Sequence, residues 1–372
     1  PVVRHVAQPD RPMKVLLAMS GGVDSSVAGA LLLGDGHEVV GVTMKLWGGD
    51  SDTGCCSVSD VDDARRVAQQ LGIDHLVFNF GDDFGRHVVD TYVADHRRGV
   101  TPNPCIECNR HLKFDRLLHR ADQLGFDAIA TGHHARIVDV GGEMALSRGA
   151  DRAKDQSYVV HMLDQRALRR TLFPVGEYDK GRVRAIAADL GLRTAMKPDS
   201  QDVCFITSTG GRTTFLGDRI PFRPGRVVDT DGRTVGAVES IEMVTIGQRR
   251  GVGLPGGGPK RYVVDVDVAG GVVTVGSDDD LRRRSVLVGS VTWTGPSARV
   301  EAEDGEVLVQ TNAHAVPHRA RLVAVVEVGA DAAGDPMRVD WIEPERRVAP
   351  GQSVVFYDPS DTRVLGGGTV ID

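Results

Sequence analysis

The stretch MKVLLAMSGGVDSSVAGALLL, from Met13 to Leu33, leads from a short apolar run through a glycine pair into an Ala- and Leu-rich run. This order predicts a strand, a tight loop and a helix. Consecutive backbone N–H groups in such a loop, reinforced by the helix dipole, can bind phosphate. The lysine of the common GxxxxGK[ST] loop, which stabilises charge during γ-phosphate transfer, is absent. The loop therefore favours chemistry in which pyrophosphate leaves and AMP goes to the substrate.

The run SGGVDSS, residues 20–26, is far more specific than isolated glycines, although a glycine turn without a ligand is the alternative. It resembles the PP-loop of the N-type ATP pyrophosphatases, which adenylate their substrates. Asp24 is placed to hold Mg²⁺ against the phosphates. The resemblance extends to Met44 after the second predicted strand and to the element ATGHHAR, and it implies ATP binding by Ala18, Met19, Ser20, Gly21, Gly22, Val23, Asp24, Ser25, Met44 and Gly132.

Short apolar runs alternate with helical patterns up to about residue 195. Strands are expected at 15–18, 39–44, 76–80 and 128–131, and helices at 25–33, 61–71, 84–98 and 108–124. This alternation predicts an α/β fold with a doubly wound parallel sheet, whose ligands bind at the carboxyl ends of the strands. After about residue 210, strand-like runs predict a small β-rich central domain and then a C-terminal β-barrel. The expected domains are 1–211, 212–282 and 283–372.

The composition is that of an ordinary globular protein, with 41% hydrophobic and 26% charged residues in a chain of 372. The absence of long apolar runs predicts a cytoplasmic protein without a secretory signal or membrane segment. Five cysteines without regular spacing predict reduced thiols, not structural disulfides. The net charge of −7 does not by itself indicate nucleic-acid binding. Basic residues nevertheless cluster at 97–98, 110–120, 166–170, 249–250 and 282–284.

Two segments carry cysteines suited to sulfur chemistry. In TPNPCIECN, residues 101–109, the prolines favour extended chain before Cys105 and Cys108 enter a helix, where the dipole and nearby cations favour thiolate. In PDSQDVCFI, residues 198–206, Cys204 supplies a further thiol. One cysteine of such a pair can carry a persulfide that the other resolves. The alternative is that Cys204, flanked by Val and Phe, is a buried packing residue.

Eight motifs along the chain together resemble the tRNA-specific 2-thiouridylases. They are SGGVDSS, TPNPCIECN, ATGHHAR, KDQSY, DVCFI, TIGQRRGVG, RYVV and PGQSVVFY, in the order of that family. The resemblance implies a PP-loop fold and the use of ATP and Mg²⁺ to adenylate the C2 oxygen of the wobble uridine of tRNA. Sulfur from a cysteine persulfide then replaces this oxygen, giving 2-thiouridine, AMP and pyrophosphate.

By the same resemblance, Cys108 matches the nucleophile and Cys204 the persulfide carrier. The implied partners are tRNAs for Lys, Glu and Gln, bound through their anticodon stem-loops, and a cysteine desulfurase or sulfur-relay protein. The residues implied to contact the target base or the tRNA are Asn103, Pro104, Cys105, His133, Lys154, Asp155, Gln156, Ala313, His314 and Gln352, of which Ala313 and His314 align more loosely.

Cys105 departs from the family pattern, because many members have Asp at this position, assigned to acid/base work. Either the thiol does this work, or the role lies elsewhere or is dispensable. A second possibility is that Cys105, Cys108 and Cys204 hold a [4Fe-4S] cluster with one iron open. A lone CxxC predicts no structural zinc site. Cys55 and Cys56, in an acidic Gly/Ser-rich loop, are expected to be a surface feature.

Two other classes of function remain compatible with parts of the sequence. A PP-loop ligase that forms amides would share the nucleotide site but would have no use for Cys108 and Cys204. A non-enzymatic RNA-binding protein with a vestigial loop would not depend on Asp24. The intact SGGVDSS run, together with both cysteine segments, favours the thiolation chemistry over either.

Overall fold

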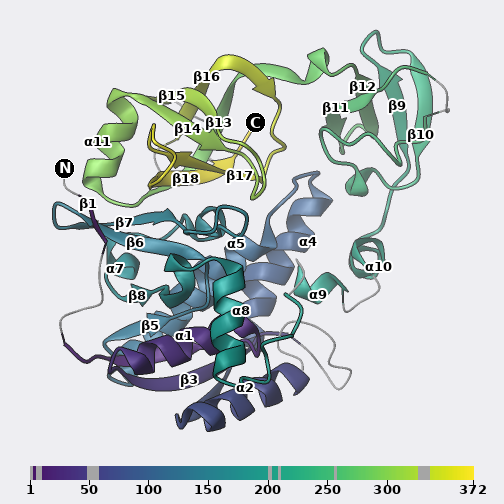
Figure 1. The fold of residues 1–372 in the computed structure, drawn as a ribbon. Coiled ribbons are helices and arrows are strands. Elements are labelled where there is room, and N and C mark those ends of the chain that lie inside the picture. The colour runs from purple at the N-terminus through teal and green to yellow at the C-terminus, as the bar shows by residue number, and fades with distance from the viewer. Residues whose placement is uncertain are drawn as a thin grey trace.

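The computed structural model describes residues 3–5, 11–47, 58–199, 203–207, 211–254, 258–325 and 336–372. Figure 1 shows a parallel-sheet part, a barrel packed over it and a small β-sheet beside the barrel. None of the helices in these ranges has the length and apolarity needed to span a bilayer. Cys55 and Cys56 lie outside the described residues.

The N-terminal part is built on a five-stranded sheet in the order β4-β3-β2-β5-β8, with every neighbouring pair parallel. This confirms the predicted fold class, and four of the strands lie within two residues of their expected positions. The strands are β2 (Lys14–Ala18), β3 (Glu38–Lys45), β4 (His75–Asn79), β5 (Ala128–Ala130) and β8 (Thr171–Leu172).

Helices cover both faces of this sheet, as the continuous apolar character of β2 requires. Val15 and Leu17 pack with one set of helices, whereas Leu16 and Ala18 belong to the core on the opposite face. The first set is α1 (Val23–Gly34), α2 (Val58–Leu71) and α8 (Lys180–Asp189); the second contains α3 (Gly81–Phe84), η1 (Gly85–Val89), α4 (Asp90–Arg97), α5 (Pro104–Cys108), η2 (Asn109–Arg116), α6 (Leu117–Gln123) and α7 (Gln165–Leu168).

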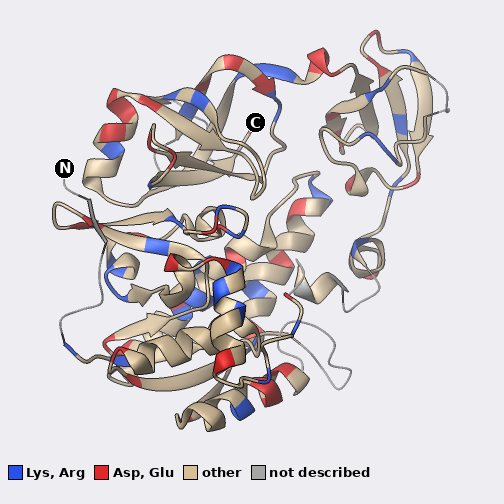
Figure 2. Ribbon diagram, viewed as in Figure 1, with Lys and Arg blue, Asp and Glu red and all other residues tan. Residues whose placement is uncertain are grey.

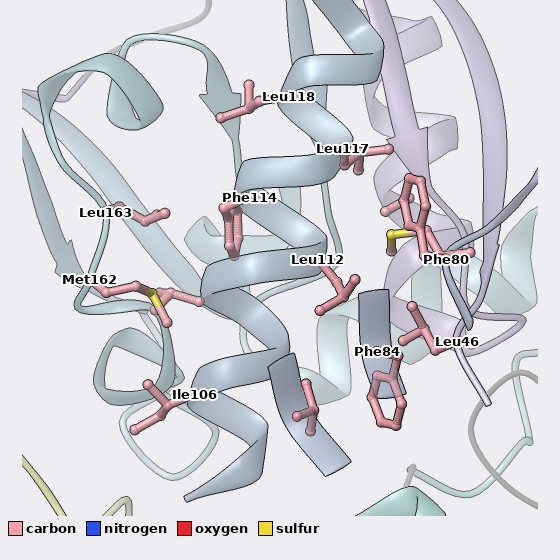
Figure 3. Close-up of a cluster of buried hydrophobic side chains, with 14 of the residues drawn as sticks. Leu46, Phe80, Phe84, Ile106, Leu112, Phe114, Leu117, Leu118, Met162 and Leu163 are labelled. Atoms are coloured by element: carbon pink, nitrogen blue, oxygen red, sulfur yellow. The ribbon is translucent and has the colours of Figure 1, made fainter. Parts of the chain in front are cut away.

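The helix that carries Cys105 and Cys108 begins at Pro104, whereas the sequence predicted a start at residue 108. As expected, it continues beyond Cys108, through the π-helical segment η2 into α6. In Figure 3, Leu112 and Leu117 point toward Phe80 and Phe84, whereas Phe114 and Leu118 point toward Leu163. Burial on two sides anchors the cysteine-bearing first turn. The wider π-turn begins directly after Cys108, and such turns are frequent at functional sites.

An antiparallel hairpin of β6 (Ala135–Val140) and β7 (Glu143–Arg148) was not predicted from the sequence. Its two-residue loop, Gly141-Gly142, has φ values of 67° and 93°, which suit the tight turns of hairpins. The short strand β1 (Val3–His5) pairs with β6. The hairpin extends the parallel-sheet part toward the barrel.

The remaining strands form a four-stranded sheet, ordered β10-β9-β12-β11, and a closed barrel, ordered β13-β16-β15-β14-β17-β18. Helix α11 (Pro296–Asp304) packs on the barrel, where the sequence predicted almost no helix. The domain boundaries stay a prediction. The strands are β9 (Gly225–Asp229), β10 (Thr234–Val238), β11 (Tyr262–Asp267), β12 (Val272–Gly276), β13 (Arg282–Trp293), β14 (Glu306–Gln310), β15 (His318–Ala324), β16 (Met337–Arg346), β17 (Ser353–Tyr357) and β18 (Val364–Val370).

Short helical segments connect these elements. They are η3 (Ser157–Val160), η4 (Pro174–Glu177), α9 (Cys204–Thr207), α10 (Arg212–Gly217), η5 (Ile241–Met243) and η6 (Asp279–Leu281). α9 and α10 lie on the chain that leaves the parallel-sheet part for the four-stranded sheet (Figure 1).

The buried guanidinium of Arg148, at the end of β7, joins the barrel to the parallel-sheet part. Its Nη1 donates to Asp155 Oδ2 at 2.8 Å, and its Nη2 donates to Asp361 Oδ1 at 2.6 Å. Nη2 also donates to Gln310 Oε1, and the group lies 3.6 Å from the centre of the Tyr357 ring. Because both Arg148 and Asp155 are nearly inaccessible to solvent, each charge depends on the other for compensation.

Replacement of Arg148 by Met should therefore lower the free energy of unfolding by about 3 kcal/mol or more, because Asp155 would keep a buried charge without its cation. The matched control is Arg233→Met, which removes an arginine whose ion pair with Asp231 is exposed. Urea unfolding of the full chain should show a lowered midpoint for the first variant and an unchanged midpoint for the second. Equal midpoints for the two variants would contradict the role assigned to Arg148.

Candidate active site

The phosphate loop lies at the carboxyl end of β2, where a doubly wound sheet binds its ligands. Gly21 has φ +71°, and a Cβ at this position would fall 2.4 Å from the backbone oxygen of Asp60 in α2. Only glycine fits this approach. Gly22 precedes α1 without a side-chain cap among the described residues, so that the first N–H groups of α1 point toward the loop.

Asp24, in the first turn of α1, is held by two cationic or protonatable side chains. Lys180 Nζ lies 2.7 Å from both carboxylate oxygens, and His134 Nε2 donates to Oδ1 at 3.1 Å. Burial raises the pKa of Asp24, but the hydrogen bonds from His134 and Lys180 outweigh it and hold the pKa below its usual value. The carboxylate is therefore ionised at neutral pH.

Lys180 was missed by the sequence analysis. It is the first residue of α8, whose amino end is capped by Asp179, and it lies 156 positions from Asp24 along the chain. The only local sequence signal is a lysine at the start of a capped helix, and nothing in its spacing points to Asp24. The fold thus places a lysine beside a phosphate loop that lacks one in its own sequence.

The element TGHH packs against the phosphate loop, as the resemblance implied. A Cβ on Gly132 would fall 2.6 Å from the backbone nitrogen of Ser25. His134 contacts Asp24, whereas the side chain of His133 is buried between Phe114 and Phe173 and bonds to Thr131 Oγ1. Burial holds the pKa of His133 well below its usual value, so this imidazole is neutral. Its predicted contact with tRNA remains untested.

Ala18, Met19 and Met44 are all buried, so a nucleotide would meet mainly their backbone atoms. The backbone N–H of Met19 donates to Val42 O, and Thr43 Oγ1 donates to Met19 O. These bonds fix the ends of β2 and β3 side by side. Met44 therefore lies at the strand end next to the phosphate loop.

The helix with the CxxC sequence starts at a capped turn. Asn103 Oδ1 accepts a hydrogen bond from Cys105 N, and Asn109 Nδ2 donates to Val159 O. Cys105 and Cys108 are both partly exposed. Glu107 pairs with His111 and Arg110, which lowers the pKa of Glu107 against the effect of burial. Part of the positive charge expected near Cys108 is thus compensated by Glu107.

The segment with Cys204 is anchored on both sides, although the side chain of Cys204 itself is not among those described. Asp199 pairs with Lys154, Lys180 and Arg184. After the cysteine, Phe205 packs edge-on against the rings of Phe84 and Phe215. Val203 has a φ of 51°, which is uncommon for a β-branched residue and bends the chain directly before Cys204.

The three residues of the KDQ loop differ in their surroundings. Asp155 is buried against Arg148, and Gln156 Oε1 accepts from His134 N. Only Lys154 of the three has a substantially exposed side chain, 45% accessible. Asp155 and Gln156 thus have structural contacts, and their contact with tRNA stays a prediction.

Gln352 of the barrel donates to Thr101 O, directly before the cysteine helix, and Thr101 N donates to Pro350 O. The barrel thereby holds the chain that leads to Asn103 and Pro104. Ala313 and His314 lie in an exposed turn of the barrel. Their predicted contact with tRNA, like that of Gln352, stays untested.

In the described part of the chain, no three His, Cys, Asp or Glu side chains are placed to hold a metal ion by themselves. A Mg²⁺ ion at the phosphate loop would thus need oxygens from a bound nucleotide in addition to Asp24. One carboxylate, serine hydroxyls and phosphate oxygens suit Mg²⁺. The residues present fit this ion when nucleotide is bound.

Comparison with known proteins gives matches along nearly the whole chain. Three family models match it in series: the tRNA methyl transferase HUP domain over residues 13–208, the tRNA methyl transferase PRC-barrel domain over 213–277 and the aminomethyltransferase beta-barrel domain over 283–370. The tRNA-specific 2-thiouridylase MnmA of Chloroflexus aggregans is 46% identical over 96% of this chain and 98% of its own length. The chain belongs to the MnmA family. This confirms the resemblance seen in its motifs.

Other relatives named MnmA support the same assignment to the MnmA family. That of Carboxydothermus hydrogenoformans is 44% identical over 96% of this chain and 97% of its own length. Among solved structures, a 4-thiouridine synthetase–RNA complex with bound ATP has 21% identity and a TM-score of 0.34, covering 54% of this chain and 47% of that one. The U34-tRNA thiolase NcsA from Methanococcus maripaludis, with its [4Fe-4S] cluster, has 18% identity and a TM-score of 0.33, covering 50% and 59%. These distant likenesses carry no argument about chemistry.

Substitution of Gly132 by Ala tests whether the TGHH element closes the nucleotide site. The new Cβ would collide with backbone atoms of Asp24 and Ser25, which cannot move without shifting the phosphate loop. We expect ATP to bind at least about tenfold more weakly, which corresponds to about 1.4 kcal/mol. Isothermal titration calorimetry of ATP with the full chain measures this.

The matched control is Gly85→Ala, because Gly85 has helical backbone angles and a Cβ there would meet nothing within 4 Å. This variant should bind ATP as the unchanged protein does. Wild-type affinity in the Gly132 variant would show that this glycine lies outside the nucleotide site.

Proposed function

We propose that this protein is a tRNA-uridine 2-sulfurtransferase, which uses ATP to replace the C2 oxygen of the wobble uridine by sulfur. The observation that carries the proposal is the PP-loop with Asp24 bound by Lys180 and His134, joined through Lys180 to the segment that bears Cys204. Full-length relatives named tRNA-specific 2-thiouridylase support the choice of substrate and product.

In the first step, the phosphates of ATP bind the N–H groups at the start of α1 and the O2 atom of the uridine attacks the α-phosphate. The bond between the α- and β-phosphates breaks, so that pyrophosphate leaves and O2 carries AMP. Lys180 lies where it can stabilise the negative charge of the leaving pyrophosphate. Mg²⁺, bound by Asp24 and the phosphates, would neutralise further charge.

In the second step, a persulfide on Cys204 attacks C2 through its terminal sulfur, and AMP leaves with the former O2. The Cys108 thiolate then attacks the sulfur of Cys204, which releases the thiouridine and leaves a Cys108–Cys204 disulfide. Release of the persulfide sulfur as hydrosulfide before attack is the second route. Both routes end in a disulfide that an external thiol must reduce with two electrons.

Cys105 lies one helical turn before Cys108, beside the capping residue Asn103. We propose that it contacts the target base together with Asn103 and Pro104, and that no acid/base step requires it. A [4Fe-4S] cluster on Cys105, Cys108 and Cys204 is not favoured. The solved thiolase that contains such a cluster resembles this chain too distantly to support it.

The tRNA is proposed to bind across Lys154 and the loops of the barrel that carry Ala313, His314 and Gln352. Several side chains of the basic clusters are paired with carboxylates, such as Arg116 with Asp83 and Arg166 with Asp122. Figure 2 accordingly shows basic and acidic residues interspersed, not segregated, over the parallel-sheet part. Binding should therefore depend on shape and on a few unpaired contacts as well as on charge. A cytoplasmic cysteine desulfurase or sulfur-relay protein is the proposed sulfur donor.

The proposal predicts which thiols are needed. Unmodified tRNA-Glu transcript would be incubated with ATP, Mg²⁺ and a persulfide donor, and its nucleosides analysed by mass spectrometry. Wild type and Cys105→Ser should form 2-thiouridine, whereas Cys108→Ser and Cys204→Ser should lose at least about 99% of the product, because each removes a group that forms or breaks a bond.

Cys56→Ser provides the control, since this cysteine lies outside the proposed set. Iron content would be recorded for each anaerobically purified variant. Loss of product in the Cys105, Cys108 and Cys204 variants alike, in proportion to iron, would replace the persulfide mechanism by a cluster mechanism. Full activity without Cys108 and Cys204 would reject sulfur transfer through this site.

A further inference from the structure

Asp199 forms ion pairs with three cationic side chains. Its Oδ2 accepts from Lys154 Nζ at 2.8 Å, and its Oδ1 accepts from Lys180 Nζ at 2.9 Å and from Arg184 Nη2 at 2.8 Å. We call these four residues the Asp199 cluster. The side chains of Asp199 and Lys154 are 34% and 45% exposed, whereas that of Lys180 is 12% exposed.

Each lysine of the Asp199 cluster also faces a proposed substrate site. Lys180 touches Asp24 in the phosphate loop through both carboxylate oxygens, at 2.7 Å. Lys154 belongs to the KDQ loop and is 45% exposed. Arg184, in contrast, is bound to the chain before Asp199 through Ala195 O and Lys197 O. Arg184 therefore holds the backbone near Asp199, whereas Lys180 also contacts the phosphate loop and Lys154 belongs to the KDQ loop.

We propose that Asp199 competes with phosphate for both lysines and thereby couples the binding of nucleotide to the binding of tRNA. This inference rests on the proposed function. A nucleotide phosphate at the loop would draw Lys180 away from Asp199, and an RNA phosphate at the KDQ loop would draw Lys154 away from it. Asp199 is thus a positioning residue for the two substrates and takes no part in the chemistry.

The coupling follows from the sharing of one carboxylate. Lys154 and Lys180 repel each other at their shared carboxylate, so the first phosphate to draw one lysine away relieves that repulsion. The second phosphate then competes with a carboxylate that has lost one cation and therefore holds the remaining lysine more strongly. Each substrate should accordingly bind less tightly when the other is present, and by the same factor in both directions.

Calorimetric titration with α,β-methylene-ATP measures this coupling, because the analogue cannot release pyrophosphate and no turnover occurs. The analogue would be titrated into the full chain with and without saturating unmodified tRNA-Glu transcript. For wild type, tRNA should weaken analogue binding about fivefold or more, within the usual range of coupling between sites. For Asp199→Asn, the analogue alone should bind more tightly than to wild type, and tRNA should change its affinity less than about twofold.

Asp189→Asn is the matched control, because it removes one exposed carboxylate from the other end of α8. It should keep the coupling of wild type. Coupling of wild-type size in Asp199→Asn would overturn the proposal and assign cooperativity to direct contact between the two substrates. Equal affinity of the analogue with and without tRNA in wild type would overturn it as well.

Lys154→Gln tests the same link from the other side and does not require the Asp199 variant to fold. Because Lys154 is largely exposed, its loss should leave the fold intact, weaken tRNA binding and abolish the effect of tRNA on the analogue. Retention of the full effect in this variant would contradict the proposal. Independent binding of both substrates to wild type rejects the coupling but leaves the proposed function intact, whereas failure of wild type to bind either substrate rejects the proposed function.

Discussion

The buried guanidinium of Arg148 is the interaction on which the arrangement of the site depends. It neutralises Asp155 of the KDQ loop and Asp361 of the barrel, and it stacks on Tyr357. Through Asp155 it fixes a loop whose next residue, Gln156, holds the backbone of His134. His134 in turn binds Asp24 in the phosphate loop. A single buried cation therefore ties the barrel to the nucleotide site through a short series of direct contacts.

The second constraint is electrostatic and concerns the phosphate loop itself. Its sequence contains no lysine, which leaves backbone N–H groups and the helix dipole as the local means of binding phosphate. Lys180 adds a positive charge from α8, and it does so while bound to two carboxylates, Asp24 and Asp199. Such a lysine can bind a phosphate only when its ion pair with one of the two carboxylates is weakened or broken.

The sequence was sufficient to predict the fold class, since alternation of apolar runs and helical patterns reports directly on a covered parallel sheet. The resemblance implied ATP binding by Gly132, which stays a prediction, and the structure places this glycine against the phosphate loop. The sequence did not predict the β6–β7 hairpin, the helix α11 or Lys180, because these depend on contacts between positions far apart in the chain. The CxxC helix was predicted one turn too short, since its first turn, which begins at Pro104, carries no periodic signal. Basic residues cluster along the sequence, but carboxylates that the sequence pattern does not reveal as partners compensate several of them.

The central claim is that ATP activates the uridine by attaching AMP to its C2 oxygen. Transfer of an oxygen label tests this most directly. Transcript tRNA-Glu that carries ¹⁸O at C2 of the wobble uridine would be thiolated by the full chain with ATP, Mg²⁺ and a persulfide donor, and the nucleotide products would be analysed by mass spectrometry. The account predicts one ¹⁸O-labelled AMP for every 2-thiouridine formed, together with pyrophosphate. Unlabelled AMP, or ADP and phosphate as the products, would contradict it.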